Sequence, residues 1–238
     1  EVSKARAEMS LKAGGIDGIK SQMIKWAGPE IDPVLQSLFN SCVWERTVPE
    51  DWRRDVKVPM SKGGPVLVPA DSRGISLNSV VEKIYERILL WRSADVLGRG
   101  KPLRDEQGGF RKGHSAAHWI WALRENMLIR PRWVVVLIDL LKAFDKVWRK
   151  AMLWKLRMMG LDTAEWHAID VLFERVSSTV RMDGWYSKVV DLCNGLKQGG
   201  IVSPWAFIVF LDDLAEELFA SGFGTEDELS LIHISEPT

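Results

Sequence analysis

An acidic side chain at the end of an apolar run is the first candidate for chemistry in this sequence. Residues 133–139, WVVVLID, form a continuous β-branched and aliphatic run that ends on Asp139. Such a run predicts a buried strand that delivers a polar residue to the edge of a sheet, followed by a helix. A carboxylate in that position either serves a reaction or simply caps the next turn. Asp139 by itself does not distinguish these two roles.

Blocks of cations and glycines accompany Asp139 in a definite order. Lys62 and Arg73 come first, and QGGFRKG follows at residues 107–113. After Asp139 comes GLKQGGIVSP, at residues 195–204. Together these blocks resemble those of a reverse transcriptase.

The resemblance is to the right-hand polymerases of non-LTR, LINE-like retrotransposons, and it extends over nearly the whole chain. Because several blocks occur in the same order and at the same spacing as in the family, the match is specific. The blocks that carry it are GGIDGI (14–19), PEDWRRDVKVPMSKGG (49–64), SRGISLNSVVEKIYERIL (72–89), LRDEQGGFRKGHS (103–115), VLIDLLKAFDKV (136–147) and GLKQGGIVSPWAFIVFLDDL (195–214).

The resemblance implies an α+β fold, the right-hand polymerase fold, with fingers and an incomplete palm. We expect the fingers over residues 1–132, helical with a β-hairpin near residues 55–75, and the N-terminal part of the palm over residues 133–228. The Tyr/Phe-x-Asp-Asp hairpin of the palm and the thumb would be missing. Residues 229–238, LSLIHISEPT, match a translated sequencing adapter, and we expect them to be an artefact.

One segment imitates the missing palm motif. Phe210, Leu211, Asp212 and Asp213 have its form, but they come only six residues after Pro204, where the family has a helix. We therefore expect the two aspartates on a helix surface, because catalytic carboxylates in this fold sit at a β-turn. Without the true motif, the truncated chain itself is expected to be inactive.

The family chemistry is nucleotidyl transfer with two Mg²⁺ ions, for which Mn²⁺ can substitute. The ions, about 4 Å apart, lower the pKa of the attacking 3′ hydroxyl and neutralise the leaving pyrophosphate. By resemblance, Asp139 is one carboxylate ligand, and the backbone carbonyl of Leu140 contacts the nucleotide-bound ion. Phe144 matches the bulky residue that packs under the sugar and excludes a 2′ hydroxyl. The alternative for Phe144 is an ordinary core phenylalanine.

Other matched positions would bind the nucleotide. Lys62 and Arg73 match the fingers residues that grip the incoming triphosphate, with a point cation and a planar guanidinium suited to polyphosphate oxygens. Gly199 would let the backbone approach the templating base pair, and Gln198 would contact the template strand.

The implied partners are an RNA template, a DNA primer and deoxynucleoside triphosphates. Arg111 and Lys112, after a Gly-Gly turn, would hold template phosphates. The second palm block departs from the usual Q-G-[DC]-[PV]-[LM]-S-P, because Gly200 and Ile201 replace the usual residues. We expect this change to loosen the loop.

Hydrophobic periodicity predicts the elements that position these residues. In the helix expected over residues 79–97, Glu82, Lys83 and Glu86 fall opposite the apolar face and are expected to point outward. Asp183-Gly184 predicts a tight hairpin turn. Further helices are expected as two short pieces within residues 14–46, over 116–130 and 148–159, from 163 to about 177, and after Pro204.

The charge balance hides an asymmetry along the chain. There are 32 Lys plus Arg and 32 Asp plus Glu, but residues 1–200 carry an excess of eight basic residues and residues 201–238 hold eight acidic residues and no basic one. The basic part favours nucleic-acid binding, with scattered surface charge as the alternative.

Cys42 and Cys193 are interpreted as isolated buried thiols in a reducing compartment. We expect an intracellular protein, in the cytoplasm and nucleus for a eukaryotic element, with no signal segment, membrane span or membrane partner; the oligomeric state is open.

Two other functions stay open at this point. A decayed element would yield a non-catalytic protein that binds RNA through its basic fingers. A group II intron-type reverse transcriptase is the near enzymatic alternative, although the block at residues 73–88 is closer to the LINE group.

Overall fold

The computed structural model describes most of the chain: residues 1–11, 14–61, 72–99, 103–104, 107–111, 113–130, 132, 134–161 and 164–221. Lys62, Lys112 and the expected adapter segment 229–238 lie outside the described residues, and so does the side chain of Arg73.

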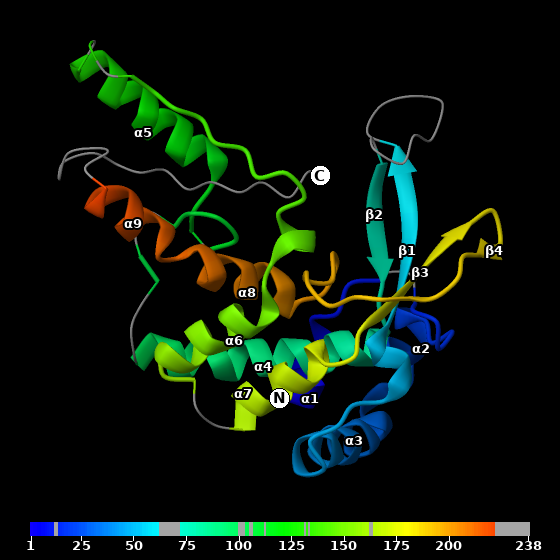
Figure 1. Ribbon diagram of the computed structural model, residues 1–238. Coiled ribbons are helices and arrows are strands. Elements are labelled where there is room, and N and C mark those ends of the chain that lie inside the picture. Colours follow the sequence, from blue (N-terminus) through cyan, green and yellow to red (C-terminus); the bar gives the residue numbers. More distant parts are fainter. Residues whose placement is uncertain are drawn as a thin grey trace.

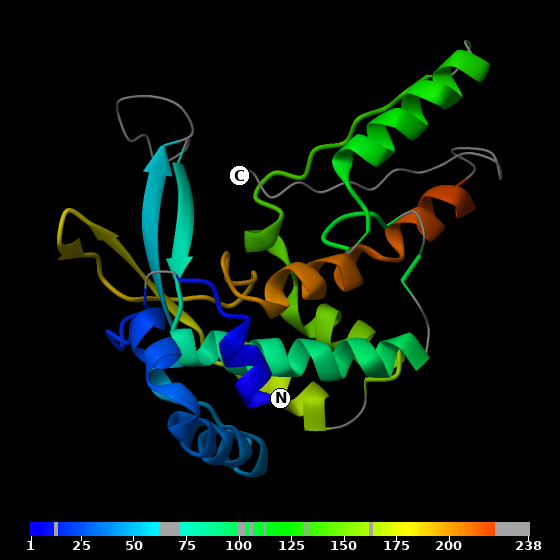
Figure 2. The same ribbon diagram turned by 180° about the vertical axis from the view of Figure 1, so that it is seen from behind.

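One long helix, α4 (Val80–Arg99), organises the fold. It crosses the centre of the molecule, with other helices on several sides of it (Figures 1 and 2). Because neighbours surround it, Val80, Ile84 and Tyr85 are all almost completely buried. The helices in contact with α4 are α1 (Val2–Ala7), α7 (Ala164–Phe173) and α8 (Val202–Leu211), and α6 (Arg149–Met158) packs on α7 and α8.

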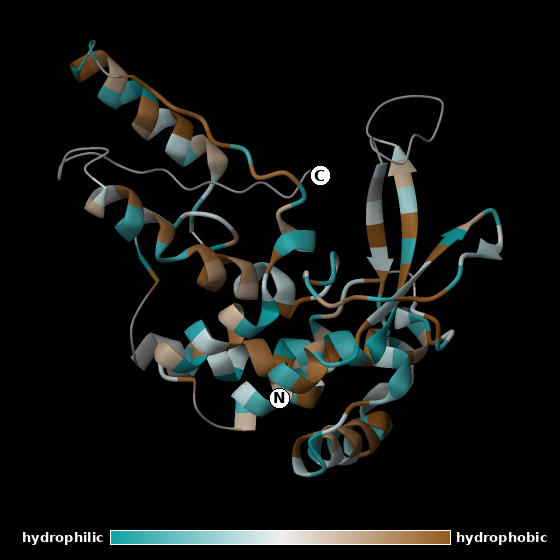
Figure 3. Ribbon diagram, in the orientation of Figure 1, coloured by the Kyte–Doolittle hydropathy of each residue, from teal (hydrophilic) through white to brown (hydrophobic). Residues whose placement is uncertain are grey.

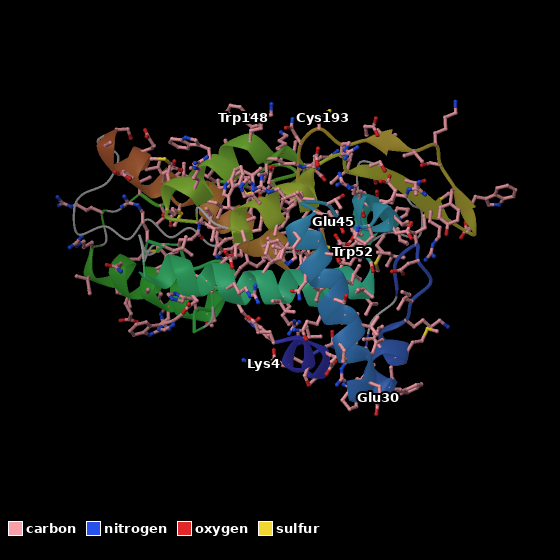
Figure 4. The ribbon with its side chains drawn as sticks, turned by 90° about the horizontal axis from the view of Figure 1, so that it is seen from below. Lys4, Glu30, Glu45, Trp52, Trp148 and Cys193 are labelled. Carbon is pink, nitrogen blue, oxygen red and sulfur yellow. The ribbon has the colours of Figure 1, made fainter. Side chains whose placement is uncertain are left out.

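Two short helices precede the sheet, as the sequence predicted. They are α2 (Ser21–Trp26) and α3 (Asp32–Trp44), separated by a 3₁₀ turn, η1 (Gly28–Ile31). Pro33 lies in the first turn of α3, where its missing N–H would have no helical partner in any case. Figure 4 shows α3 from below, with Glu30 beside its start and Glu45 at its end.

A mixed sheet joins the two halves of the chain. Its strand order is β2-β1-β3-β4, and β5 also pairs with β3. The expected hairpin is present as the antiparallel pair β1–β2, and β1 pairs in parallel with β3, which comes more than a hundred residues later. The bounds are η2 (Glu50–Arg53), β1 (Arg54–Ser61), β2 (Ser72–Leu77), β3 (Ser177–Met182), β4 (Trp185–Tyr186) and β5 (Val190–Asp191).

The remaining predicted elements are confirmed with small shifts. Asp183 and Gly184 both have positive φ, 50° and 85°, which is the type I′ geometry that joins β3 to β4. Helix α7 ends at Phe173, earlier than expected, because the residues from Ser177 onward enter the sheet. The other elements are α5 (Ala116–Ile129), η4 (Phe144–Lys146) and α9 (Leu214–Ala220).

The buried strand expected at residues 133–139 is wrong for the part that the structure describes. Residues 134–139 form no strand there, and the side chains of Val134 and Leu137 are each 88% exposed. Figure 3 shows this apolar segment in brown where the chain returns from the end of α5. An apolar run becomes a strand only when a neighbour supplies ladder hydrogen bonds, and no described strand lies beside it.

The outward orientation expected for Glu82 and Glu86 is also wrong. They are 1% and 2% exposed, because α4 is covered on the side that the periodicity assigned to water. Cys42 is buried as expected, whereas Cys193 is exposed and lies at the edge of the molecule in Figure 4.

None of the helices in the described ranges has the length and apolar character that a membrane crossing requires.

Candidate active site

Three sequence blocks that lie far apart in the chain meet at an aromatic cluster around Phe144. The Phe144 ring stacks on Phe207 of α8, with the ring centres 4.8 Å apart. Phe110 lies edge-on to Phe144, with the ring centres 6.1 Å apart. Phe207 is buried and Phe144 is partly buried against the core. The two neighbouring rings therefore fix the position of Phe144, and its role toward a sugar stays a prediction.

Asp139 and Leu140 lie in the exposed segment that leads to this cluster. The Asp139 side chain is exposed, and Leu140 is 43% exposed. A carboxylate and a backbone carbonyl are hard oxygen donors of the kind that Mg²⁺ prefers. Within the described ranges, however, no three Asp, Glu, His or Cys side chains gather where they could hold a metal ion. These two donors suit Mg²⁺ in kind, and their role as metal ligands stays a prediction.

The start of the second palm block docks on the turn that holds Phe144. The Leu196 N–H donates to the Phe144 carbonyl at 2.9 Å, and the Gly195 N–H donates to the Val147 carbonyl at 2.9 Å. Gly195 has φ +86°, and a Cβ on it would lie 2.8 Å from the carbonyl oxygen of Asp145. Only glycine therefore fits at this contact between the two palm blocks.

Gly195→Ala is expected to lower the free energy of unfolding by at least about 2 kcal/mol, because it combines positive φ with a backbone clash. Gly184→Ala is the matched control: its φ is +85°, and a Cβ there would meet nothing within 4 Å. Its cost should be about 1 kcal/mol. Urea denaturation followed by circular dichroism measures both, and equal losses would show that the contact with Asp145 is unimportant.

The rest of the loop contacts β2, the strand that carries Arg73. The Ser76 N–H donates to the Gln198 carbonyl at 3.0 Å. Gly199 has φ +114°, and a Cβ on it would lie 3.0 Å from the Ser76 carbonyl oxygen. The backbone of Arg73, in β2, lies opposite Met60 of β1 in the antiparallel pair. The structure thus brings the backbone of Gln198 and Gly199 against Ser76 of the β1–β2 hairpin.

Arg111 has local partners in its own loop. Its Nη1 donates to the carbonyls of Arg104 at 2.7 Å and Gln107 at 3.0 Å. Gly108 is required in this loop because a Cβ would lie 1.9 Å from Nε1 of Trp119. Arg111 therefore helps to close the loop, and its contact with template phosphates stays a prediction.

A buried ionic group under the loop was missed by sequence reasoning. The Lys197 ammonium bonds to Glu82 at 2.5 Å and to the carbonyl of Trp52, which is labelled in Figure 4. The Ile201 N–H donates to Glu86 at 2.5 Å. The one available signal was Lys197 itself, a lysine enclosed in a glycine-rich apolar block.

Burial raises the pKa of Glu82 to about 7 from an ordinary 4.5, and nearby Glu86 raises it further, while Lys197 and Lys83 oppose the shift. Between about pH 4.5 and 7, Glu82 is therefore protonated in the folded protein but has lost its proton in the unfolded chain. The free energy of unfolding should therefore fall as the pH rises through this window. We expect Glu82→Gln to flatten that slope, measured by urea denaturation at several pH values. Glu45→Gln, at an exposed position, should keep the slope of the unmodified chain.

Arg149 is a second buried cation that the sequence did not single out. It is 8% exposed and donates to four backbone carbonyls: Leu192 and Asn194 at 2.7 and 3.1 Å, Gly195 at 2.6 Å and Phe173 at 3.1 Å. Burial lowers the pKa of its guanidinium. The sequence did contain a hint of its role: Arg149 is in the first turn of α6, where a cation is unfavourable next to the positive end of the helix dipole unless other groups hold it there.

The segment from Phe210 to Asp213, which has the form of the Tyr/Phe-x-Asp-Asp motif, lies at the end of a helix, as expected, and not at a β-turn. Asp212 is the C-terminal cap residue of α8, and Lys155 pairs with Asp213 at 2.5 Å. The expected surface position is wrong for Asp212, which is 6% exposed, because its carboxylate accepts the Arg104 N–H at 3.0 Å.

Comparisons with known proteins agree with this arrangement. Residues 60–225 match the family described as "Reverse transcriptase (RNA-dependent DNA polymerase)". The chain is 27% identical over 220 residues to a Drosophila melanogaster protein of transposon BS, named a probable RNA-directed DNA polymerase, covering 90% of this chain and 24% of that protein. It is 26% identical over 236 residues to the RNA-directed DNA polymerase from mobile element jockey of the same species, covering 96% and 26%. It is 26% identical over 175 residues to the Pol polyprotein of the type-1 retrotransposable element R2 of Popillia japonica, covering 70% and 24%. The chain spans about a quarter of the length of these relatives.

Proposed function

Since this chain belongs to the reverse transcriptase family, we propose that it forms the fingers and the first part of the palm of a non-LTR retrotransposon RNA-directed DNA polymerase. The fingers would comprise residues 1–132 and the palm portion residues 133–228. The observation that carries the proposal is the docking of the Gln198–Gly199 loop on both β2 and the Phe144 turn. That docking supports the proposal because the resemblance assigns the contacts with the sugar, the template and the triphosphate to these three segments.

In this proposal each block has one task toward the substrates. Lys62 and Arg73 bind the triphosphate of the incoming nucleotide through charge-assisted hydrogen bonds. Gln198 and Gly199 contact the templating base pair, and Arg111 and Lys112 lie along the template backbone. The substrates are an RNA template, a DNA primer and deoxynucleoside triphosphates.

Asp139 and the carbonyl of Leu140 would hold part of the divalent metal site, and further donors would come from outside the described residues. When bound, Mg²⁺ ions activate the 3′ hydroxyl and neutralise the pyrophosphate. The protein's own contribution is to hold the nucleotide and the primer end in register, which lowers the entropic part of the barrier.

RNA-templated primer extension tests the proposal directly. A version of the protein continued past residue 228 through the rest of the polymerase should extend a DNA primer on RNA, and residues 1–228 alone should not. Extension by residues 1–228 would contradict the assignment of an incomplete site. Salt-dependent RNA binding without extension by the longer protein would instead support a decayed, RNA-binding remnant.

Phe144→Val is expected to raise the incorporation of ribonucleotides relative to deoxynucleotides by about tenfold, because the smaller side chain leaves room for a 2′ hydroxyl. The measurement is the ratio of kcat/KM for the two nucleotides in the extended polymerase. Phe210→Val, on α8 but outside the aromatic cluster, should leave the ratio unchanged. An unchanged ratio in Phe144→Val would show that Phe144 is an ordinary core phenylalanine with no part in nucleotide selection.

A further inference from the structure

Helix α8 receives its N-terminal cap from a different helix. Its own N-cap residue, Ile201, makes no side-chain capping bond. The Ile201 N–H donates instead to Oε2 of Glu86 at 2.5 Å, and the Val202 N–H also bonds to this carboxylate. The first N–H groups of a helix have no helical partners and carry partial positive charge, so an anionic oxygen is a strong acceptor for them.

Gly200 makes room for this cap. A Cβ on Gly200 would lie 3.1 Å from Oε1 of Glu86 and 2.8 Å from the Ser203 hydroxyl. Gly200 is also where the block departs from the usual acidic or cysteine residue. The sequence pattern predicts that this departure loosens the loop. In the structure, the Glu86 carboxylate lies next to Gly200.

The opposite end of the loop is held one helical turn earlier on α4. Lys197 bonds to Glu82 at 2.5 Å, and their side chains are 3% and 1% exposed. Between the two attachments, Gly199 is exposed and Gln198 is partly exposed. The loop is therefore attached to α4 at Lys197 and at Ile201, while Gln198 and Gly199 between them remain accessible to solvent.

We propose that Glu86 is a positioning residue that, opposite the Lys197–Glu82 pair, holds the loop so that Gln198 and Gly199 face the template and nucleotide. This inference rests on the proposed polymerase function for its consequence. The attachment of the loop to α4 does not depend on that function and is tested separately.

Hydrogen exchange on the chain itself tests the attachment. Glu86→Ala should speed exchange of the Ile201 and Val202 amides by about tenfold or more, since each loses its acceptor. Glu86→Gln keeps an acceptor of the same length and should restore most of the protection. Ile88→Val, buried on the same helix, is the matched control and should leave these amides unchanged. Unchanged exchange in Glu86→Ala would overturn the inference.

Gly200→Ala provides a second variant that leaves Glu86 in place. Its Cβ presses on the carboxylate, so it should speed exchange of the same two amides. Full protection in Gly200→Ala would contradict the close approach of Glu86 to the loop.

Kinetics of the extended polymerase test the consequence. Glu86→Ala should raise KM for the deoxynucleotide about tenfold, with a smaller change in kcat. In a Gln198→Ala background it should add little, because both substitutions remove the same contact, the one that Gln198 makes with the template. Effects that multiply in the double variant would show that Glu86 acts only on overall stability. If the unmodified polymerase shows no extension, the proposed function fails while the exchange result still decides the attachment.

Discussion

Asp139→Asn is expected to lower kcat for RNA-templated primer extension about a thousandfold in the polymerase continued past residue 228. The change removes one anionic oxygen ligand, and metal-ion stabilisation of developing charge amounts to several kcal/mol, with about 1.4 kcal/mol for each factor of ten. Because the side chain is exposed, the free energy of unfolding should change by less than about 0.5 kcal/mol. The two measurements together separate a chemical role from a structural one.

Asp183→Asn is the matched control for this substitution. Asp183 is exposed in the turn between β3 and β4 with φ 50°, a conformation that asparagine also adopts readily. It should extend primers at the unmodified rate. Retention of more than about a tenth of the activity in Asp139→Asn would exclude Asp139 as a metal ligand.

Arg149→Met is expected to lower the free energy of unfolding by about 3–5 kcal/mol, the largest stability effect that we predict for this chain. The guanidinium supplies hydrogen bonds to four carbonyls from the end of α7 and from residues 192–195. A methionine fills similar volume but donates nothing, so those carbonyls lose their donors. Urea denaturation monitored by circular dichroism gives the free energy directly.

Two further variants sharpen this test. Arg149→Lys keeps the charge, but an ammonium has only three donors and no planar fork, so an intermediate loss is expected. Lys150→Met makes the same kind of replacement at the next, exposed residue and should cost less than about 0.5 kcal/mol. If Arg149→Met were within about 1 kcal/mol of the unmodified chain, Arg149 would not be a principal link between α6, the end of α7 and residues 192–195.

Local sequence pattern was sufficient for the elements that depend on near neighbours. Helices α3 and α5 and the turn at Asp183-Gly184 were predicted close to their observed positions. A helical period and a pair of residues that accept positive φ act within a few positions of the chain, so they can be recognised without the fold. The order of the blocks also sufficed to indicate the family, which the comparisons then confirmed.

The same local reasoning failed where distant segments decide the environment. Glu82 and Glu86 were assigned to solvent because the periodicity of α4 allows one wet face, yet their partners Lys197 and Ile201 lie 115 residues away. The apolar run at residues 133–139 was assigned to a buried strand, yet its described part, residues 134–139, has no neighbouring strand in the described sheet.

The sequence by itself thus determined the family, the order of its blocks and most of the helices, because these follow from residue identity and short-range periodicity. Only the tertiary structure decided which charges are buried, how Arg149 and Glu86 join the palm blocks to the rest of the fold, and where the Gln198–Gly199 loop is held. The physical reason is that a buried charge is tolerated only beside specific partners, and those partners are chosen by the packing of segments far apart in the chain.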